Sequence, residues 1–208
     1  MNPPDETWEV MLSEPKIKEL WTKIKDFDKL FSDECTGDIE SFVHGIMDPN
    51  TTVLECDYGI LVLSDIVKGS RAEAHLTFWD KKLSAHTVLV QECLVWAFLN
   101  FDLNRITVKS PAYARFVHNF LYTKLGFHHE GTLRQYIKKD GVFVDMLVFG
   151  LLRKEALNAA TRNLRGHPRF DPDEYRRHVL RTNSLQRHPK VSRRGKSAES
   201  DRSDRSCA

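Results

Sequence analysis

The sequence predicts an α+β fold in which helices flank a mostly antiparallel sheet. Two pairs of apolar, β-branched segments are each separated by a short turn, which is the pattern of a β-hairpin. A further segment repeats apolar residues at helical spacing and ends at Gly126, a residue type that commonly closes a helix. The hairpins are expected over Thr51–Cys56 with Ile60–Ile66 and over Leu133–Ile137 with Val142–Leu152.

Length and composition predict one domain with appendages. A chain of 208 residues with 41% hydrophobic content can bury one substantial core. The four cysteines have no CxxC spacing and no signal peptide precedes them, which predicts a reduced, cytoplasmic setting. No apolar run approaches the roughly 20 residues that span a bilayer, so no membrane partner is expected. We expect a monomer or homodimer without a metal ion.

Two helices are expected ahead of the sheet. Pro15 opens the first helix, and the second runs from Gly37 to Met47, where Asp48-Pro49-Asn50 ends it. The apolar stripe of the first helix comprises Ile17, Leu20, Trp21, Ile24 and Phe31. The inward residues of the second are Ile39, Phe42, Val43 and Ile46.

A third strand is expected from Ala72 to Trp79. Alternation puts Glu73, His75 and Thr77 on one face. The other face carries Ala72, Ala74, Leu76 and Phe78. Two interpretations of the polar face stay open: it faces water, or it lines an active-site cleft.

The remaining elements follow in order. An apolar helix runs to about Leu99, and a strand from Arg105 to Lys109 ends at Ser110-Pro111. The helix that ends at Gly126 starts near Ala112. Its apolar residues at helical spacing are Tyr113, Phe116, Val117, Phe120, Leu121 and Leu125.

The segments around Gly126 resemble a known family. Tyr122-Thr123-Lys124-Leu125-Gly126-Phe127, then Glu130-Gly131-Thr132-Leu133-Arg134, then Asp145, resemble the C-terminal half of the GNAT acyl-CoA N-acyltransferases. The likeness is nearest to the branch that acetylates ribosomal-protein N-termini and aminoglycosides, and the order of elements agrees from about Ile17 to Glu155. The resemblance implies a GNAT-type mixed sheet and acetyl-CoA as cosubstrate. It also implies that the pantetheine arm lies where two central strands splay apart, and that the N-terminal helices wall the acceptor cleft.

The resemblance places a pyrophosphate loop after the third strand. Lys81 takes the place of the family's Arg or Gln, Ser84 that of the first Gly, and His86 that of the last Gly or Ala. Such a loop binds an anion through backbone N–H groups at a helix N-terminus, and small residues allow close approach. A solvated turn is the alternative for the lysines, as a surface arginine is for Arg115. The residues expected to bind acetyl-CoA are Phe78, Trp79, Lys81, Lys82, Leu83, Ser84, Ala85, His86, Thr87 and Arg115.

Three residues are candidates for catalysis. Transfer to an ammonium acceptor requires a base with a pKa near neutrality, and Glu73 and His75 are the candidates. Tyr122 holds the position where many GNAT enzymes carry a tyrosine that protonates the departing thiolate of coenzyme A; an ordinary half-buried aromatic is the alternative. Arg134 and Asp145 are expected to form a structural or substrate-orienting pair, because neighbouring strands bring them together.

Charge divides the chain. Residues 156–208 carry 13 Lys and Arg against 6 Asp and Glu, a net charge of +7, which leaves −5 on residues 1–155. The expected organisation is an N-terminal arm (1–13), a GNAT-like domain (14–155), a basic helical extension (156–181) and a disordered basic tail (182–208). The tail is either a solvated segment or a weak polyanion-binding site.

The predicted function is N-acetyl transfer from acetyl-CoA to a primary amine by direct attack. The sequence leaves the acceptor open among protein N-termini, lysines and small amines. The alternative is a catalytically silent GNAT-fold binding or structural module, such as a phage or mobile element would encode.

Overall fold

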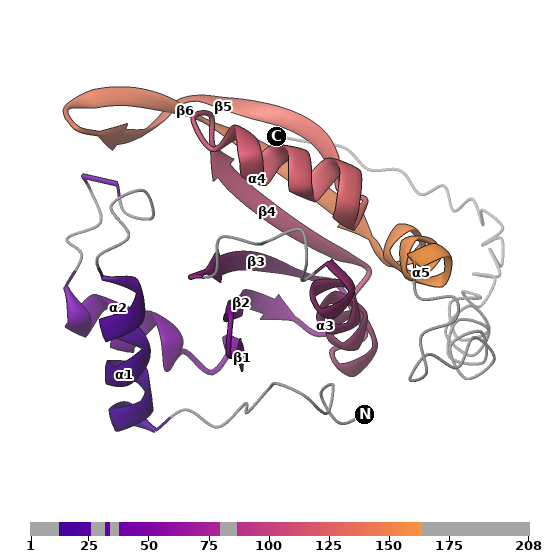
Figure 1. Cartoon of the computed structure of the whole chain (residues 1–208), viewed down its shortest axis with the longest axis horizontal. Coiled ribbons are helices and arrows are strands. Elements are labelled where there is room, and N and C mark those ends of the chain that lie inside the picture. The colour runs from indigo at the N-terminus through magenta and orange to yellow at the C-terminus, as the bar shows by residue number, and fades with distance from the viewer. Residues whose placement is uncertain (1–12, 26–31, 34–37, 80–86, 164–208) are drawn as a thin grey trace, which may run out of the picture. The chain divides into compact units, whose positions relative to one another are not determined.

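The computed structural model describes residues 13–25, 32–33, 38–79 and 87–163 (Figure 1). All of them belong to one unit, Met1–Phe170, and the second unit, Asp171–Ala208, lies outside the described residues. The expected pyrophosphate-loop residues Lys81 to His86, the N-terminal arm up to residue 12 and the basic tail also lie outside them.

A six-stranded sheet organises the described residues. The strands are β1 (Thr52–Cys56), β2 (Gly59–Val67), β3 (Arg71–Phe78), β4 (Arg105–Pro111), β5 (His128–Lys139) and β6 (Val142–Leu152). They pair in the order β1-β2-β3-β4-β6-β5. Only β3 and β4 pair in parallel among these strands. The mixed, mostly antiparallel sheet that the sequence predicted is thus confirmed.

Helices cover both faces of this sheet because its strands alternate apolar side chains between the faces. On one face, Leu54, Leu61 and Ala74 pack with α3 (Thr87–Asn100), with α4 (Arg115–Phe120) and with the first residues of α5 (Arg153–Asn163). On the other face, residues of β1 and β2 such as Val53 and Ile60 pack with α1 (Glu14–Ile24) and α2 (Ile39–Ile46). Figure 1 shows α1 and α2 beside each other, away from α3 and α5.

The two N-terminal helices form for the expected reasons. Pro15 stands in the first turn of α1, where a missing N–H costs nothing. The Asp38 side chain caps α2 by accepting the Ser41 N–H at 2.7 Å. The expected residues of α1 from Ile17 to Ile24 are buried. Both helices are shorter than predicted, and Phe31 lies outside the described residues.

The helix before Gly126 departs from regular α geometry. It begins at Arg115 and not near Ala112, because β4 extends through Pro111. Its last turn, η2 (Leu121–Leu125), is a π-helix, and Gly126 closes it with the left-handed φ of 80° that the sequence predicted. The following strand starts at His128, five residues before the predicted start.

The final helix, α5, crosses the expected domain boundary at Glu155. Its buried residues are Ala156, Leu157, Ala159 and Ala160. They lie at helical spacing and pack the helix against α3, so the fold continues into the expected basic extension. None of the helices in the described ranges is long and apolar enough to cross a membrane.

Candidate active site

The parallel strands β3 and β4 separate partway along their length. Arg71, Ala72 and Glu73 pair with Arg105, Ile106 and Thr107, and the ladder then stops. Beyond it β3 continues along β2 to Phe78, whereas β4 continues along β6 to Pro111. Figure 1 shows the two strands diverging. Their facing edges therefore carry backbone N–H and C=O groups that do not pair across the sheet, the kind of edge that an extended ligand can join.

Three polar side chains gather on one face where the ladder ends. Lys109 of β4 donates to the Glu73 carboxylate of β3 at 2.6 Å. This hydrogen bond raises the pKa of Lys109, so the ammonium stays charged. His75 lies on the same face as Glu73, two residues further along β3 and beside the opening. The expected carboxylate–imidazole face is therefore present, with a lysine that sequence reasoning missed.

His75 has the properties of a neutral imidazole. Its Nε2 lies 3.2 Å from the Ser64 hydroxyl of β2. The side chain remains open to solvent, yet desolvation by the surrounding protein lowers the pKa of His75, and the charge of Lys109 lowers it further. The charge of Glu73 acts in the opposite direction. Near pH 7 the ring is free to accept a proton.

A polar cavity of about 430 Å³ lies at the foot of the opening. It extends from Glu73 and Thr107, the last β3–β4 pair, to the irregularity in β2 at Asp65, whose φ is 50°. Asp48 and Arg71 also line it. Three of these side chains are carboxylates, against the guanidinium of Arg71 and the Lys109 ammonium that pairs with Glu73, so the net charge of the lining is negative.

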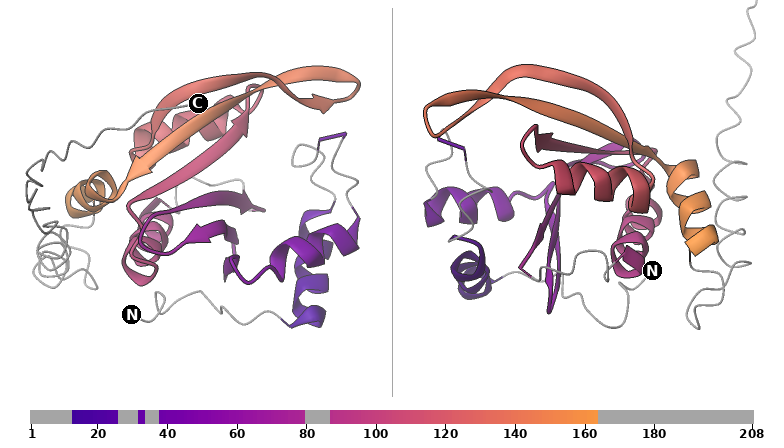
Figure 2. Two further views of the ribbon diagram at one scale, coloured as in Figure 1. Left: turned by 180° about the vertical axis from the view of Figure 1, so that it is seen from behind. Right: turned by 45° about the horizontal axis from the view of Figure 1, so that its top comes forward.

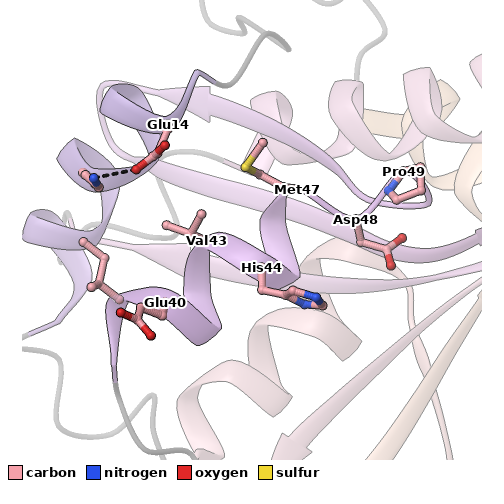
Figure 3. Close-up of a pocket in the computed structure, with 9 residues that line it drawn as sticks. Glu14, Glu40, Val43, His44, Met47, Asp48 and Pro49 are labelled. Carbon is pink, nitrogen blue, oxygen red and sulfur yellow. Dashed lines mark ion pairs between the residues drawn. The ribbon is translucent and has the colours of Figure 1, made fainter.

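A second cavity, of about 620 Å³, lies between α1 and α2 (Figure 3). Val43, Met47 and Pro49 supply its apolar wall. Its acidic side chains include Glu14, whose carboxylate pairs with Lys18 of α1 at 2.6 Å, and Asp48. Because Asp48 lines both cavities, the acidic lining runs from the N-terminal helices to the foot of the β3–β4 opening.

The long β5–β6 hairpin is irregular beside this site. Between Leu133 and Ile137 the register shifts, and Gln135 adopts a φ of 51°. The Asp145 carboxylate accepts the Gln135 N–H at 2.8 Å, which fixes the bulge. No ion pair joins Arg134 and Asp145 in the described ranges, so the predicted pair is wrong: the bulge gives the carboxylate a backbone partner instead.

The bulge also introduces an aromatic residue that sequence reasoning missed. Tyr136 is half exposed, and it lies close enough to Lys109 for a negative charge on its oxygen to raise the pKa of Lys109. Tyr136 therefore lies within electrostatic reach of the ion pair between Lys109 and Glu73. No sequence signal marks it, because the bulge breaks the alternation that assigns residues to faces.

Asp33 joins the turn of the hairpin to the connection between α1 and α2. Its two carboxylate oxygens accept the N–H groups of Asp140 and Gly141, each at 2.8 Å. These bonds lower the pKa of Asp33. Figure 2 shows the hairpin tip near residues 32–33 in both views. The helical part and the hairpin are thereby tied together next to the site.

The Glu130-Gly131 motif has a structural role. The Glu130 carboxylate accepts two hydrogen bonds from the guanidinium of Arg105 in β4, one of them 2.8 Å long, and the two groups form an ion pair. It reaches Arg105 across Gly150, where an added Cβ would stand 2.5 Å from Glu130 Cδ. Because glycine has no side chain, position 150 has room for the Glu130 carboxylate to pass over it to Arg105.

Four of the residues expected to bind acetyl-CoA are described by the structure, and they lie in different surroundings. Thr87 is the first residue of α3, next to the expected loop, and Arg115 is exposed at the start of α4. Phe78 packs against the main core. Trp79 donates its indole N–H to the Asp57 carbonyl at 2.6 Å, so its ring is held at the β1–β2 turn. These placements neither join the residues into one cluster nor test their binding role.

Tyr122, the expected acid, lies in the π-helical turn. Its side chain is 63% exposed, and its hydroxyl has no hydrogen-bond partner among the residues that the structure describes. The position of the phenol is therefore set by the backbone of η2.

Known proteins resemble this chain in structure. No family model matches the sequence, and no curated protein matches it. Spermidine N-acetyltransferase SpeG from Vibrio cholerae, in complex with CoA and spermine, aligns with a TM-score of 0.59 at 17% identity, covering 74% of this chain and 100% of SpeG. A chimera of that enzyme and hSSAT gives 0.59 at 20%, covering 73% and 98%. A probable acetyltransferase gives 0.54 at 18%, covering 74% and 97%. The chain therefore has the fold of the GNAT N-acetyltransferases, as the resemblance implied.

Proposed function

We propose that this protein is an N-acetyltransferase that moves an acetyl group from acetyl-CoA to the primary amine of a small, cationic acceptor. The observation that carries the proposal is the separation of β3 and β4, with the His75 imidazole beside the opening. The open strand edges offer hydrogen bonds to an extended amide-bearing arm, and the imidazole offers a base. The resemblance and the CoA-bound neighbour support acetyl-CoA as the donor.

The chain's residues account for the proton transfers. His75 takes the proton that the acceptor nitrogen loses, which leaves a lone pair to attack the thioester carbonyl. As the new C–N bond forms and the C–S bond breaks, the Tyr122 phenol donates its proton to the departing sulfur, and the second proton that the nitrogen loses on becoming an amide is returned to the phenolate through water. Both roles rest on the resemblance together with the positions of the two side chains.

His75 is preferred to Glu73 as the base. The Glu73 carboxylate already accepts the Lys109 ammonium at 2.6 Å, and a base has to release such a partner before it accepts a proton. Within the described part of the chain, the His75 ring has the Ser64 hydroxyl as its one hydrogen-bond partner, and that hydroxyl is a donor or an acceptor as required. Glu73 and Lys109 then set the electrostatic potential at the ring.

The acceptor class follows from the acidic lining. Asp48, Asp65 and Glu73 line the cavity at the foot of the opening; Arg71 and the Lys109 partner of Glu73 offset two of these three charges, which leaves the lining net negative. Asp48 also lines the cavity between α1 and α2. A small amine with a second positive charge matches both the reaction and this lining, whereas a neutral amine matches only the reaction. SpeG, with a similar fold, was solved with spermine.

Two measurements test the proposal. Isothermal titration calorimetry with acetyl-CoA should give micromolar binding. A panel of labelled-acetyl assays should then find turnover with diamines and polyamines and much less with neutral amines of the same length. Absence of binding at millimolar acetyl-CoA would reject the enzyme and leave the catalytically silent module.

A further inference from the structure

The π-helical turn that carries Tyr122 needs outside partners for its backbone. The last carbonyl groups of any helix have no partner within the helix. At the end of η2, the Gly126 and Phe127 N–H groups both bind the Leu121 carbonyl, the latter at 3.0 Å. The Lys124 carbonyl is instead bound by a side chain from another helix.

That side chain is Gln91 of α3. Its Nε2 donates to the Lys124 carbonyl at 2.8 Å. Gln91 is only 3% exposed, and the residues beside it in α3, among them Val90, Cys93 and Leu94, are buried and apolar. Its Oε1 is buried and has no hydrogen-bond partner among the residues that the structure describes. A buried amide with one unsatisfied oxygen is costly where leucine or methionine would pack without that cost, which calls for a compensating role.

We propose that Gln91 is a positioning residue for Tyr122. The bond to the Lys124 carbonyl holds the wide turn in its π geometry, and the exposed phenol has no other described contact to set its direction. Each residue of an α-helix advances the chain by about 100° around the axis. A change of this turn from π-helical to α-helical geometry would therefore rotate the Tyr122 side chain to another direction. π-Turns of this kind are frequent at functional sites. The inference rests on the proposed function and adds to it the residue that fixes the acid.

Gln91 also lies between the expected cofactor-binding loop and the turn that carries the expected acid, Tyr122. It lies in the second turn of α3, the helix that follows the expected pyrophosphate loop. One side-chain hydrogen bond therefore joins α3 to the turn that carries Tyr122.

A double-mutant cycle tests the inference. We would measure kcat and the KM for acetyl-CoA in wild type, Gln91→Met, Tyr122→Phe and the double variant. Tyr122→Phe should lower kcat by about ten- to a thousand-fold, because the phenol acts in the transition state. Gln91→Met should lower kcat by about three- to thirty-fold with KM changed less than about two-fold, and it should add nothing in the Tyr122→Phe background.

Two further variants separate positioning from general stability. Gln91→Glu keeps the shape but donates only when its carboxyl is protonated, and burial raises the pKa of that carboxyl. Its kcat relative to wild type should therefore rise from about pH 8 to about pH 6. Thr161→Val is the matched control, since Thr161 also donates to a helix carbonyl, that of Leu157 at 2.8 Å, but in α5. It should leave kcat unchanged even where the melting temperature falls.

The outcomes are distinct. Additive effects of Gln91→Met and Tyr122→Phe would overturn the inference and leave the acetyltransferase standing. An unchanged rate in Tyr122→Phe would overturn it together with the role of the phenol, while turnover itself would still support the enzyme. If Gln91→Met fails to fold, the cycle is run with Gln91→Glu, and a flat pH ratio there rejects the inference. No turnover by wild type rejects the proposed function.

Discussion

The charges around His75 predict opposite pH shifts for two substitutions. Glu73 raises the pKa of His75, and Lys109 lowers it. Glu73→Gln removes the attraction and leaves the lysine charge uncompensated, so the pKa should fall. Lys109→Met removes the repulsion and frees the carboxylate, so the pKa should rise. Both side chains of the ion pair are about 30% exposed (31% and 27%), which limits each effect.

The magnitude follows from that exposure. Partly exposed charge pairs contribute about 0.2–1 kcal/mol, and one pKa unit corresponds to about 1.4 kcal/mol, so each shift should be about 0.1–0.7 of a unit. Desolvation lowers the pKa of His75 below the ordinary histidine value of 6.5, and the acid limb of kcat/KM should lie there. Activity requires the neutral ring, so it is lost as pH falls through this pKa.

The assay is the pH profile of kcat/KM in wild type and both variants, with the His75 C2 proton followed by NMR. The limb should move to lower pH in Glu73→Gln and to higher pH in Lys109→Met. If the acid limb of kcat/KM moved in the same direction in both variants, His75 would not be the base. A limb that moved while the NMR titration of His75 did not would also refute the assignment.

Three further predictions concern the fold, the loop and the tail. Gly150→Ala should displace the Glu130 carboxylate from Arg105 and lower the free energy of unfolding by about 0.2–1 kcal/mol, because the pair is partly exposed. Thermal unfolding measures this loss. An equal loss of stability in a Glu130→Ala background would show that the ion pair is not its cause. Lys81→Ala should weaken acetyl-CoA binding by about 1–3 kcal/mol in calorimetry, as expected for a charge-assisted phosphate contact, and unchanged affinity would favour a solvated turn. Deletion of residues 182–208 should leave the melting temperature unchanged but reduce salt-dependent binding to nonspecific duplex DNA. Identical binding of both proteins would reject the polyanion role.

Regular alternation made much of the fold predictable. The polar face of β3 followed from a period of two residues, and the left-handed Gly126 followed from its residue type after a helical pattern. Lys109 was not predictable, because it lies 36 residues from Glu73 and meets it only through parallel pairing around α3. Gln91 gave no signal either, since one polar residue in an apolar helix does not reveal its partner.

Other differences arise where local patterns are weak. The first residues of β5, His128 to Glu130, are polar and exposed because β5 is an edge strand with few core contacts. The bulge that presents Tyr136 depends on a carboxylate from the neighbouring strand. By contrast, Ala156, Leu157 and Ala160 do have helical spacing, so α5 could have been found from the sequence.

The most direct test of the account is acetyl transfer itself, followed by mass spectrometry of the acceptor. Spermidine and acetyl-CoA would be incubated with wild type, with His75→Ala and with His128→Ala, the last replacing an exposed histidine at the start of β5. Wild type and His128→Ala should yield monoacetylated product at equal rates, and His75→Ala should be slower by about a hundred- to ten-thousand-fold at pH 7. Equal product from all three proteins would contradict the role of His75, and no product from wild type with any amine would contradict the acetyltransferase.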